Sequence, residues 1–101
     1  MAGVRLSREA QSDFDDLIAY LRGVAGSVVA HRYGRQILTA ISLLANFPDM
    51  GTARPELGTA TRLIIVHPYL IFYERSGEKS EATVLRILHS ARKVSEALLT
   101  K

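Results

Sequence analysis

The feature that most constrains the fold is a pair of helical apolar patterns in the first half of the chain. The first pattern follows Ser7, a good helix N-cap, and its apolar residues recur at helical spacing: Ala10, Phe14, Leu17, Ile18 and Leu21. The second spans residues 30–45, with Gly34 on its apolar stripe, where a glycine predicts close approach to the first helix or the sheet. Residues 23–26 (Gly-Val-Ala-Gly) end the first helix, and Ser27 can cap the second. Two amphipathic helices joined by about four residues predict an antiparallel helical hairpin.

Short β-rich runs flank the helical patterns. Residues 4–6 predict a strand before the first helix. After the second helix, the content of Val, Ile, Tyr, Phe and Thr predicts further strands at residues 62–66, 69–75 and 82–89. The expected fold is α+β: an N-terminal strand, an antiparallel helical hairpin, then a mainly antiparallel sheet of three further strands, in the order β-α-α-β-β-β, with a short C-terminal helix or tail.

The remaining segments connect these elements within one domain, residues 1–101. Residues 49–61 are rich in turn formers and predict a long loop. Residues 76–80 (Ser-Gly-Glu-Lys-Ser) predict a hairpin turn. Residues 94–99 predict a short terminal helix, which is too short to be stable unless it docks.

The two helices are expected to cover one face of the sheet and leave the other open. Alternation along the last strand puts Val84, Arg86 and Leu88 on one face and Leu85, Ile87 and His89 on the other. The predicted helix-facing set is Leu85 and Ile87, together with either Phe72 or Ile71. Arg86 is then expected on the open face, where a ligand or partner can reach it.

Composition and charge narrow the class of protein. No cysteine is present, which excludes disulfides and thiolate chemistry. The N-terminus does not read as a signal peptide, no apolar run is long enough to span a membrane, and a cytoplasmic protein is expected. The net charge of +3 comes entirely from residues 51–101, which carry eight basic and five acidic side chains. This asymmetry favours an anionic partner for the C-terminal half.

Several short segments, in their order and spacing, carry a resemblance to a known family. They are Phe47-Pro48, Gly51, Arg54-Pro55-Glu56-Leu57-Gly58, Arg62 and the two strand segments 68–73 and 84–92. Together they resemble the ParE/RelE superfamily of bacterial toxins, and most closely its ParE branch. The resemblance covers residues 4–92.

The resemblance implies the toxin component of a type II toxin–antitoxin module. A ParE-like toxin inhibits DNA gyrase and is neutralised by a cognate antitoxin, whose flexible C-terminal segment is typically acidic and amphipathic. It also implies a possible toxin–antitoxin heterotetramer, no cofactor and no membrane association. The antitoxin is expected to contact the outer groove of the helical hairpin and the open face of the sheet.

The alternative is a RelE-like, ribosome-dependent mRNA endoribonuclease, the only case in which direct contact with nucleic acid is expected. Such cleavage needs a general base, a general acid and cations for the phosphorane charge. The candidates are His89 as acid or base and Arg62, Arg86 and Arg92 as cations, while Tyr73 could stack a base. No tyrosine follows Tyr73, although RelE-like members use one in the C-terminal segment. Binding is therefore favoured over catalysis.

The residues expected to contact the target or the antitoxin are Arg62, Tyr69, Tyr73, Arg86, His89, Arg92 and Lys93. Each has a structural alternative: Arg86 can pair with Glu74 on the neighbouring strand, and His89 can be a hydrogen-bonded strand-end histidine. The tyrosines can be core or interface aromatics. The three histidines lack metal-ligand spacing, so no metal site is expected.

Overall fold

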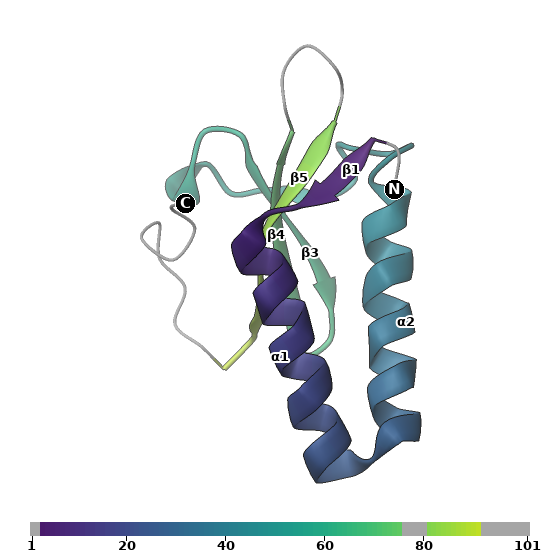
Figure 1. The fold of residues 1–101 in the computed structure, drawn as a ribbon. Coiled ribbons are helices and arrows are strands. Elements are labelled where there is room, and N and C mark those ends of the chain that lie inside the picture. Colours follow the sequence, from purple (N-terminus) through teal and green to yellow (C-terminus); the bar gives the residue numbers. More distant parts are fainter. Residues whose placement is uncertain (1–2, 76–80, 92–101) are drawn as a thin grey trace.

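The computed structural model describes residues 3–75 and 81–91, which form two helices lying against one sheet (Figure 1). In chain order the elements are β1 (Val4–Leu6), α1 (Arg8–Ala25), α2 (Ser27–Leu43), β2 (Thr52–Ala53), a 3-10 helix η1 (Pro55–Leu57), β3 (Thr61–Val66), β4 (Tyr69–Arg75) and β5 (Ala82–His89). The strand order in the sheet is β1-β5-β4-β3-β2. The predicted α+β class and helical hairpin are confirmed.

The sheet differs from the expectation in two details. It is mixed rather than purely antiparallel, because β1 runs parallel to β5 while the other pairs are antiparallel. It also has one more strand: the segment 49–61, expected to be a loop, contains β2 and η1. The predicted turn at 76–80 and the predicted helix at 94–99 lie outside the described residues.

The helical hairpin is tighter than expected. Ser7 caps α1 as predicted, its Oγ accepting from the Ala10 N–H at 3.0 Å. The helix then continues to Ala25, so that Gly26 alone joins the helices with a φ of 90°, which favours glycine. The predicted linker of about four residues and the predicted Ser27 cap are therefore wrong. Gly34 lies where the helices approach closely, since a Cβ there would be 3.0 Å from Ile18 Cδ1.

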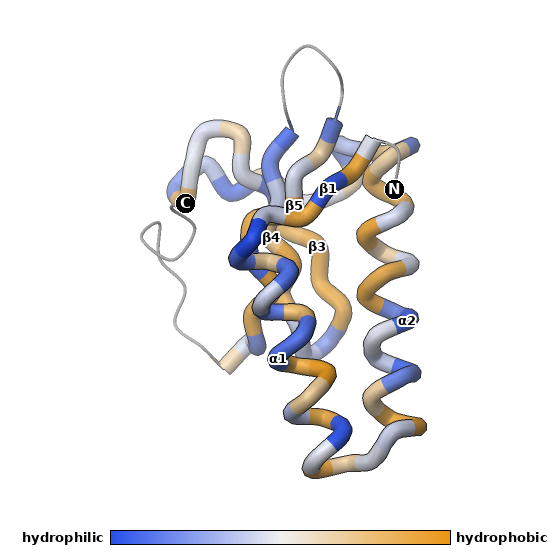
Figure 2. The backbone as a smooth tube through the Cα atoms, in the orientation of Figure 1, coloured by the Kyte–Doolittle hydropathy of each residue, from blue (hydrophilic) through white to orange (hydrophobic). Residues whose placement is uncertain are grey.

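The main core lies between the hairpin and the sheet, and apolar stretches of both layers face it (Figure 2). Its fully buried large side chains come from α2, the end of that helix, β4 and β5: Ile37, Ile41, Leu44, Ile71, Tyr73 and Val84. Burying each such side chain contributes about 1.5–3 kcal/mol. Within the described residues, neither helix is long and apolar enough to cross a membrane.

A β-bulge decides which residues face the helices. Phe72 pairs with Arg86 but Tyr73 pairs with Val84, so the register shifts by one residue at Leu85. As a result Val84 joins Ile87 in the main core, and the strict alternation expected for β5 is wrong.

On β4 the helix-facing residue is Ile71, whereas Phe72 packs in a second cluster with Leu63 and Leu88. Leu57 of η1 packs against this second cluster. The sheet face that was expected to be open is therefore covered in part.

Candidate functional site

Arg86, which interrupts an apolar strand, forms a two-point ion pair with Asp13 of α1. Its Nε and Nη2 donate to the two carboxylate oxygens at 2.7 and 2.9 Å. The side chains are only 16% and 14% exposed. The hydrogen bond to Asp13 raises the pKa of Arg86, against the opposing effect of burial. In the register of the sheet Phe72, and not Glu74, lies opposite Arg86. The ion pair of Arg86 with Asp13 therefore takes the place of the cross-strand pair with Glu74 that the sequence suggested.

The position of Asp13 follows from the edge of the sheet. β1 ends at Leu6, opposite Val84, so beyond that point β5 has a strand neighbour only on its β4 side. Ser7, directly after β1, bonds to this edge of β5: its N–H donates to Val84 O and its Oγ to Leu85 O, each at 2.9 Å. Asp13 Oδ2 then accepts from the Ile87 N–H at 3.0 Å. Sequence reasoning missed Asp13, although an arginine inside a strand already required a carboxylate partner.

Arg62 and Tyr73 hold the segment that follows α2. Arg62 Nη1 donates to the carbonyl oxygens of Asp49 and Gly51 at 3.1 and 2.7 Å. The Tyr73 hydroxyl donates to Pro48 O at 2.7 Å and accepts from the Gly51 N–H at 2.9 Å. Tyr73 is 0% exposed, and burial raises its pKa. The ring lies in the core and not on a surface where it could stack on a base, which corrects the role suggested from sequence.

Tyr69 and His89 do come together, as the register pairs them across β4 and β5. Their rings meet edge to face with centroids 5.7 Å apart, and Tyr33 of α2 meets Tyr69 in the same way at 5.9 Å. The Nδ1 atom of His89 accepts from the Ala91 N–H at 3.0 Å, a local bond that matches the structural alternative for this histidine. The remaining candidates, Arg92 and Lys93, lie outside the described residues.

A groove of about 620 Å³ surrounds this aromatic cluster, and we call it the tyrosine groove. One face of α1 forms one wall, and the ends of β4 and β5 form the other. Its lining residues are Asp13, Asp16, Leu17, Tyr20, Leu21, Tyr33, Pro68, Tyr69, Ile87, Leu88 and His89. Tyr69 is buried, whereas Tyr20 at the rim is 66% exposed. Burial, with a smaller effect of the neighbouring tyrosines, raises the pKa of Tyr69.

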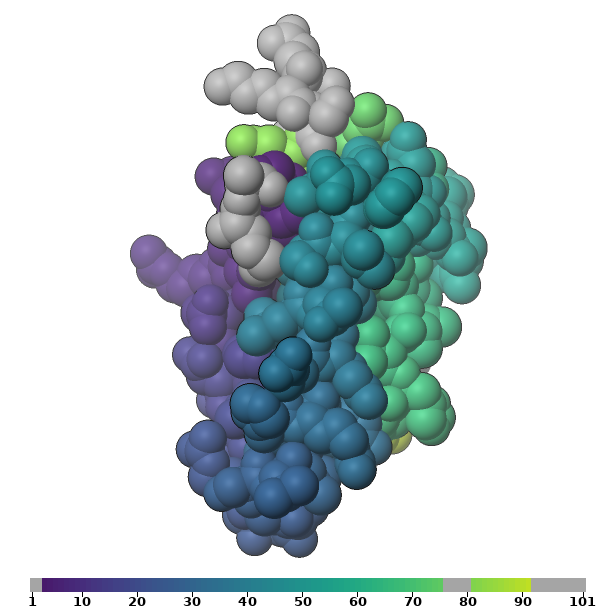
Figure 3. All heavy atoms as spheres, turned by 90° about the vertical axis from the view of Figure 1, so that its right-hand side faces the viewer, coloured from purple at the N-terminus to yellow at the C-terminus, as the bar shows by residue number. Residues whose placement is uncertain are grey.

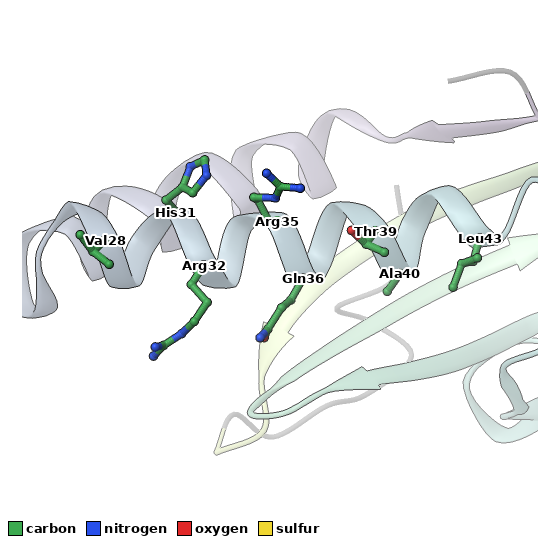
Figure 4. A pocket seen from close by; sticks show the side chains of 8 residues that line it. All are labelled: Val28, His31, Arg32, Arg35, Gln36, Thr39, Ala40 and Leu43. Atoms are coloured by element: carbon green, nitrogen blue, oxygen red, sulfur yellow. The ribbon is translucent and has the colours of Figure 1, made fainter.

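The outer side of α2 presents a second hollow of about 690 Å³, here called the α2 face. It is lined by Val28, His31, Arg32, Arg35, Gln36, Thr39, Ala40 and Leu43, whose side chains project from successive turns of one helix (Figure 4). The helix crosses the front of the molecule in Figure 3. No acidic residue occurs between Asp16 and Asp49, so the arginines of this face have no carboxylate neighbour on their own helix.

The outer groove of the hairpin, expected from sequence, is present beside the α2 face. It measures about 390 Å³ and lies between the two helices, around Gly34. Apolar side chains of both helices form its floor, and Arg22, His31 and Arg35 are among its lining residues. The hairpin thus carries apolar recesses bordered by cations.

These features define a small α+β domain with several recessed surfaces. Its described residues offer recessed surfaces of two kinds, one aromatic and one basic, while Arg62 and Arg86 are engaged within the fold. Within that part of the chain, no group of three or more His, Asp or Glu side chains could hold a metal ion.

Comparison with known proteins gives the family. The family described as the ParE toxin of the type II toxin–antitoxin system parDE matches residues 4–94. Toxin ParE1 of Caulobacter vibrioides is 32% identical over 91 residues, which cover 90% of this chain and 92% of that protein. A structure of the chromosomal ParDE system from P. aeruginosa has the same fold, with a TM-score of 0.73, 21% identity and coverage of 88% of this chain and 96% of that chain. The chain belongs to the ParE toxin family.

Proposed function

We propose that this toxin inhibits DNA gyrase and that a cognate antitoxin neutralises it, in the cytoplasm and in a toxin–antitoxin heterotetramer. Membership of the ParE family supports the target, because inhibition of gyrase is the family's usual activity. The structural similarity to a ParDE system supports an antitoxin partner.

The arrangement of the arginines carries the preference for binding over RNA cleavage. By register Arg62 lies opposite Tyr73, and Arg86 lies opposite Phe72. Tyr73 and Phe72 are adjacent on β4, so their side chains, and those of their partners, point to opposite sides of the sheet. Cleavage by a 2′-hydroxyl needs its cations and its acid or base around one phosphate. Two of the three candidate cations thus leave the sheet from opposite faces, and both are bonded within the fold, Arg86 to Asp13 of α1 and Arg62 to the backbone that follows α2.

The α2 face and the outer groove are the surfaces that we propose for the antitoxin. Val28, Leu38 and Leu43 are 81%, 40% and 43% exposed there, so their apolar surface is open to a partner. Arg32 and Arg35 lie among them. An acidic amphipathic segment would cover the apolar residues and pair with the cations at the same time.

The first experiment separates the two candidate targets. Purified toxin should inhibit DNA supercoiling by gyrase and should leave ribosome-bound mRNA intact. The His89→Ala variant should inhibit gyrase as the parent does if His89 has no chemical role. Cleavage of mRNA by the parent toxin, abolished in His89→Ala, would contradict the proposal and establish the endoribonuclease.

The second experiment tests the antitoxin surface by charge reversal. The double variant Arg32→Glu/Arg35→Glu should bind the antitoxin at least about tenfold more weakly, with a reduced salt dependence. Arg8→Glu is the matched control, because Arg8 is also exposed but lies at the start of α1, away from the α2 face. Arg8→Glu changes the net charge by two units and the double variant by four, so a loss of binding free energy half as large in Arg8→Glu would mean that only the net charge of the toxin matters.

A further inference from the structure

The tyrosine groove contains hydrogen-bonding groups that the fold leaves unused. Tyr20, Tyr33 and Tyr69 all line it, and none of their hydroxyls bonds to any described residue. Tyr69 is only 6% exposed, but its hydroxyl oxygen remains accessible to solvent, and the residue lines the groove. A phenol hydroxyl that the fold leaves available in the wall of a groove can donate a hydrogen bond to a bound ligand or accept one from it.

The charged side chains around the groove favour a positively charged ligand. None of the described residues that line it is Arg or Lys, whereas Asp13 and Asp16 lie on its α1 wall. Arg86 neutralises Asp13. Asp16 is exposed and makes no hydrogen bond or ion pair within the described part of the chain. A cation entering the groove would therefore gain the Asp16 carboxylate as a partner.

The aromatic rings favour a planar cation. The guanidinium of Arg32 already lies 5.6 Å from the centroid of the Tyr33 ring, so one ring of the cluster stacks with such a group in the free protein. A guanidinium can contact an aromatic ring and at the same time donate hydrogen bonds to phenol and carboxylate oxygens, which an ammonium does less well.

We propose that the tyrosine groove binds an arginine side chain of the antitoxin, held between the tyrosine rings and the Asp16 carboxylate. The proposal rests on the proposed function, since it assumes an antitoxin partner. It assigns the two recessed surfaces opposite roles: the α2 face takes the acidic part of the partner, and the tyrosine groove takes a cation.

The direct test uses a small probe and the toxin alone. N-acetyl-arginine N-methylamide, titrated into labelled toxin, should shift the NMR signals of Leu17, Tyr20 and Tyr69 in a saturable manner. The citrulline analogue, which is neutral and nearly the same shape, should not. Asp16→Asn should weaken binding of the arginine probe about threefold, as expected for one partly solvated ion pair.

Asp15→Asn is the matched control for Asp16→Asn. Asp15 is the neighbouring exposed carboxylate of α1, but it does not line the groove and accepts a hydrogen bond from Gln11 instead. It should leave probe binding unchanged. Equal shifts with the citrulline probe, or equal weakening by Asp15→Asn, would overturn the groove as an arginine site.

The antitoxin itself provides the second arm. Asp16→Asn should lower the affinity of the toxin for the antitoxin about threefold or more, while Asp15→Asn should not. Equal affinity of both variants would overturn the antitoxin as the source of the arginine. Failure of the parent toxin to bind any antitoxin would instead contradict the proposed function, and the probe titration would still decide whether the groove binds arginine.

Discussion

Tyr69 and Tyr73 lie four residues apart on β4, and both belong to the core between the sheet and the helices. Their exposed fractions, 6% and 0%, are nearly the same. Their hydroxyls differ completely. That of Tyr73 is bonded to Pro48 and Gly51, whereas that of Tyr69 makes no hydrogen bond to any described residue and lies beside the tyrosine groove.

This difference teaches that burial alone does not separate structural from binding residues. Tyr73 uses its donor and its acceptor capacity to fix the segment after α2, so the fold accounts for its polar group. The fold accounts only for the ring of Tyr69. The hydrogen bonds of a tyrosine hydroxyl, and not the exposed fraction of the whole residue, are the better guide to a site.

The largest effect on stability is expected from Asp13→Ala, which tests whether a residue in the α1 wall of the groove also stabilises the fold. The change would remove the Asp13 carboxylate from the Arg86 guanidinium and from the Ile87 N–H. We expect a loss of about 3 kcal/mol in the free energy of unfolding, measured by urea denaturation. Asp16→Ala, one turn further along the same wall, should change it by less than about 0.5 kcal/mol. Similar values for both would mean that the Asp13–Arg86 pair contributes little.

A smaller loss is expected from Tyr73→Phe, which keeps the ring and removes only the hydroxyl. The Gly51 N–H would lose its buried acceptor and the Pro48 carbonyl its donor. The free energy of unfolding should fall by about 1–3 kcal/mol in the same denaturation assay. An unchanged stability would remove the contrast between the two tyrosines.

Alkaline pH offers an independent measure of the same buried phenols. Burial raises the pKa of both Tyr69 and Tyr73, so the unfolded chain loses these protons first as the pH rises. The stabilisation from the protonated phenols is complete below the pKa of tyrosine in the unfolded chain, about 10, and is lost as the pH rises through the pKa values of the folded state. The free energy of unfolding of each Tyr→Phe variant should therefore fall less than that of the parent between pH 9 and 11, a range of about one unit on either side of the unfolded tyrosine pKa.

The smallest effect is expected from Tyr69→Phe. No described residue bonds to the hydroxyl, so the free energy of unfolding should change by less than about 0.5 kcal/mol. Its effect should appear in ligand binding, where the phenol oxygen is missing. A loss as large as that of Tyr73→Phe would show that the hydroxyl has a structural partner.

The sequence by itself determined the order of the elements and much of their extent. Helical and alternating periodicities are local properties, so the two helices, the Ser7 cap and the limits of β4 and β5 could be read directly. The family resemblance was also available, because it depends on the order of segments. The sequence predicted only a loop at 49–61 and missed β2 and η1, because the turn-rich composition of this segment does not reveal elements of two or three residues.

Only the tertiary structure decided which side chains meet. The partner of Arg86 is Asp13, 73 residues away, because β1 is too short to pair with the end of β5 and α1 reaches that edge instead. The bulge at Leu85 reversed the expected face of Val84, and hydrogen bonds placed Arg62 and Tyr73 in the framework of the fold. Periodicity specifies a residue's face within its own element, whereas a site depends on which edges and carbonyls are left unsatisfied when the elements pack together.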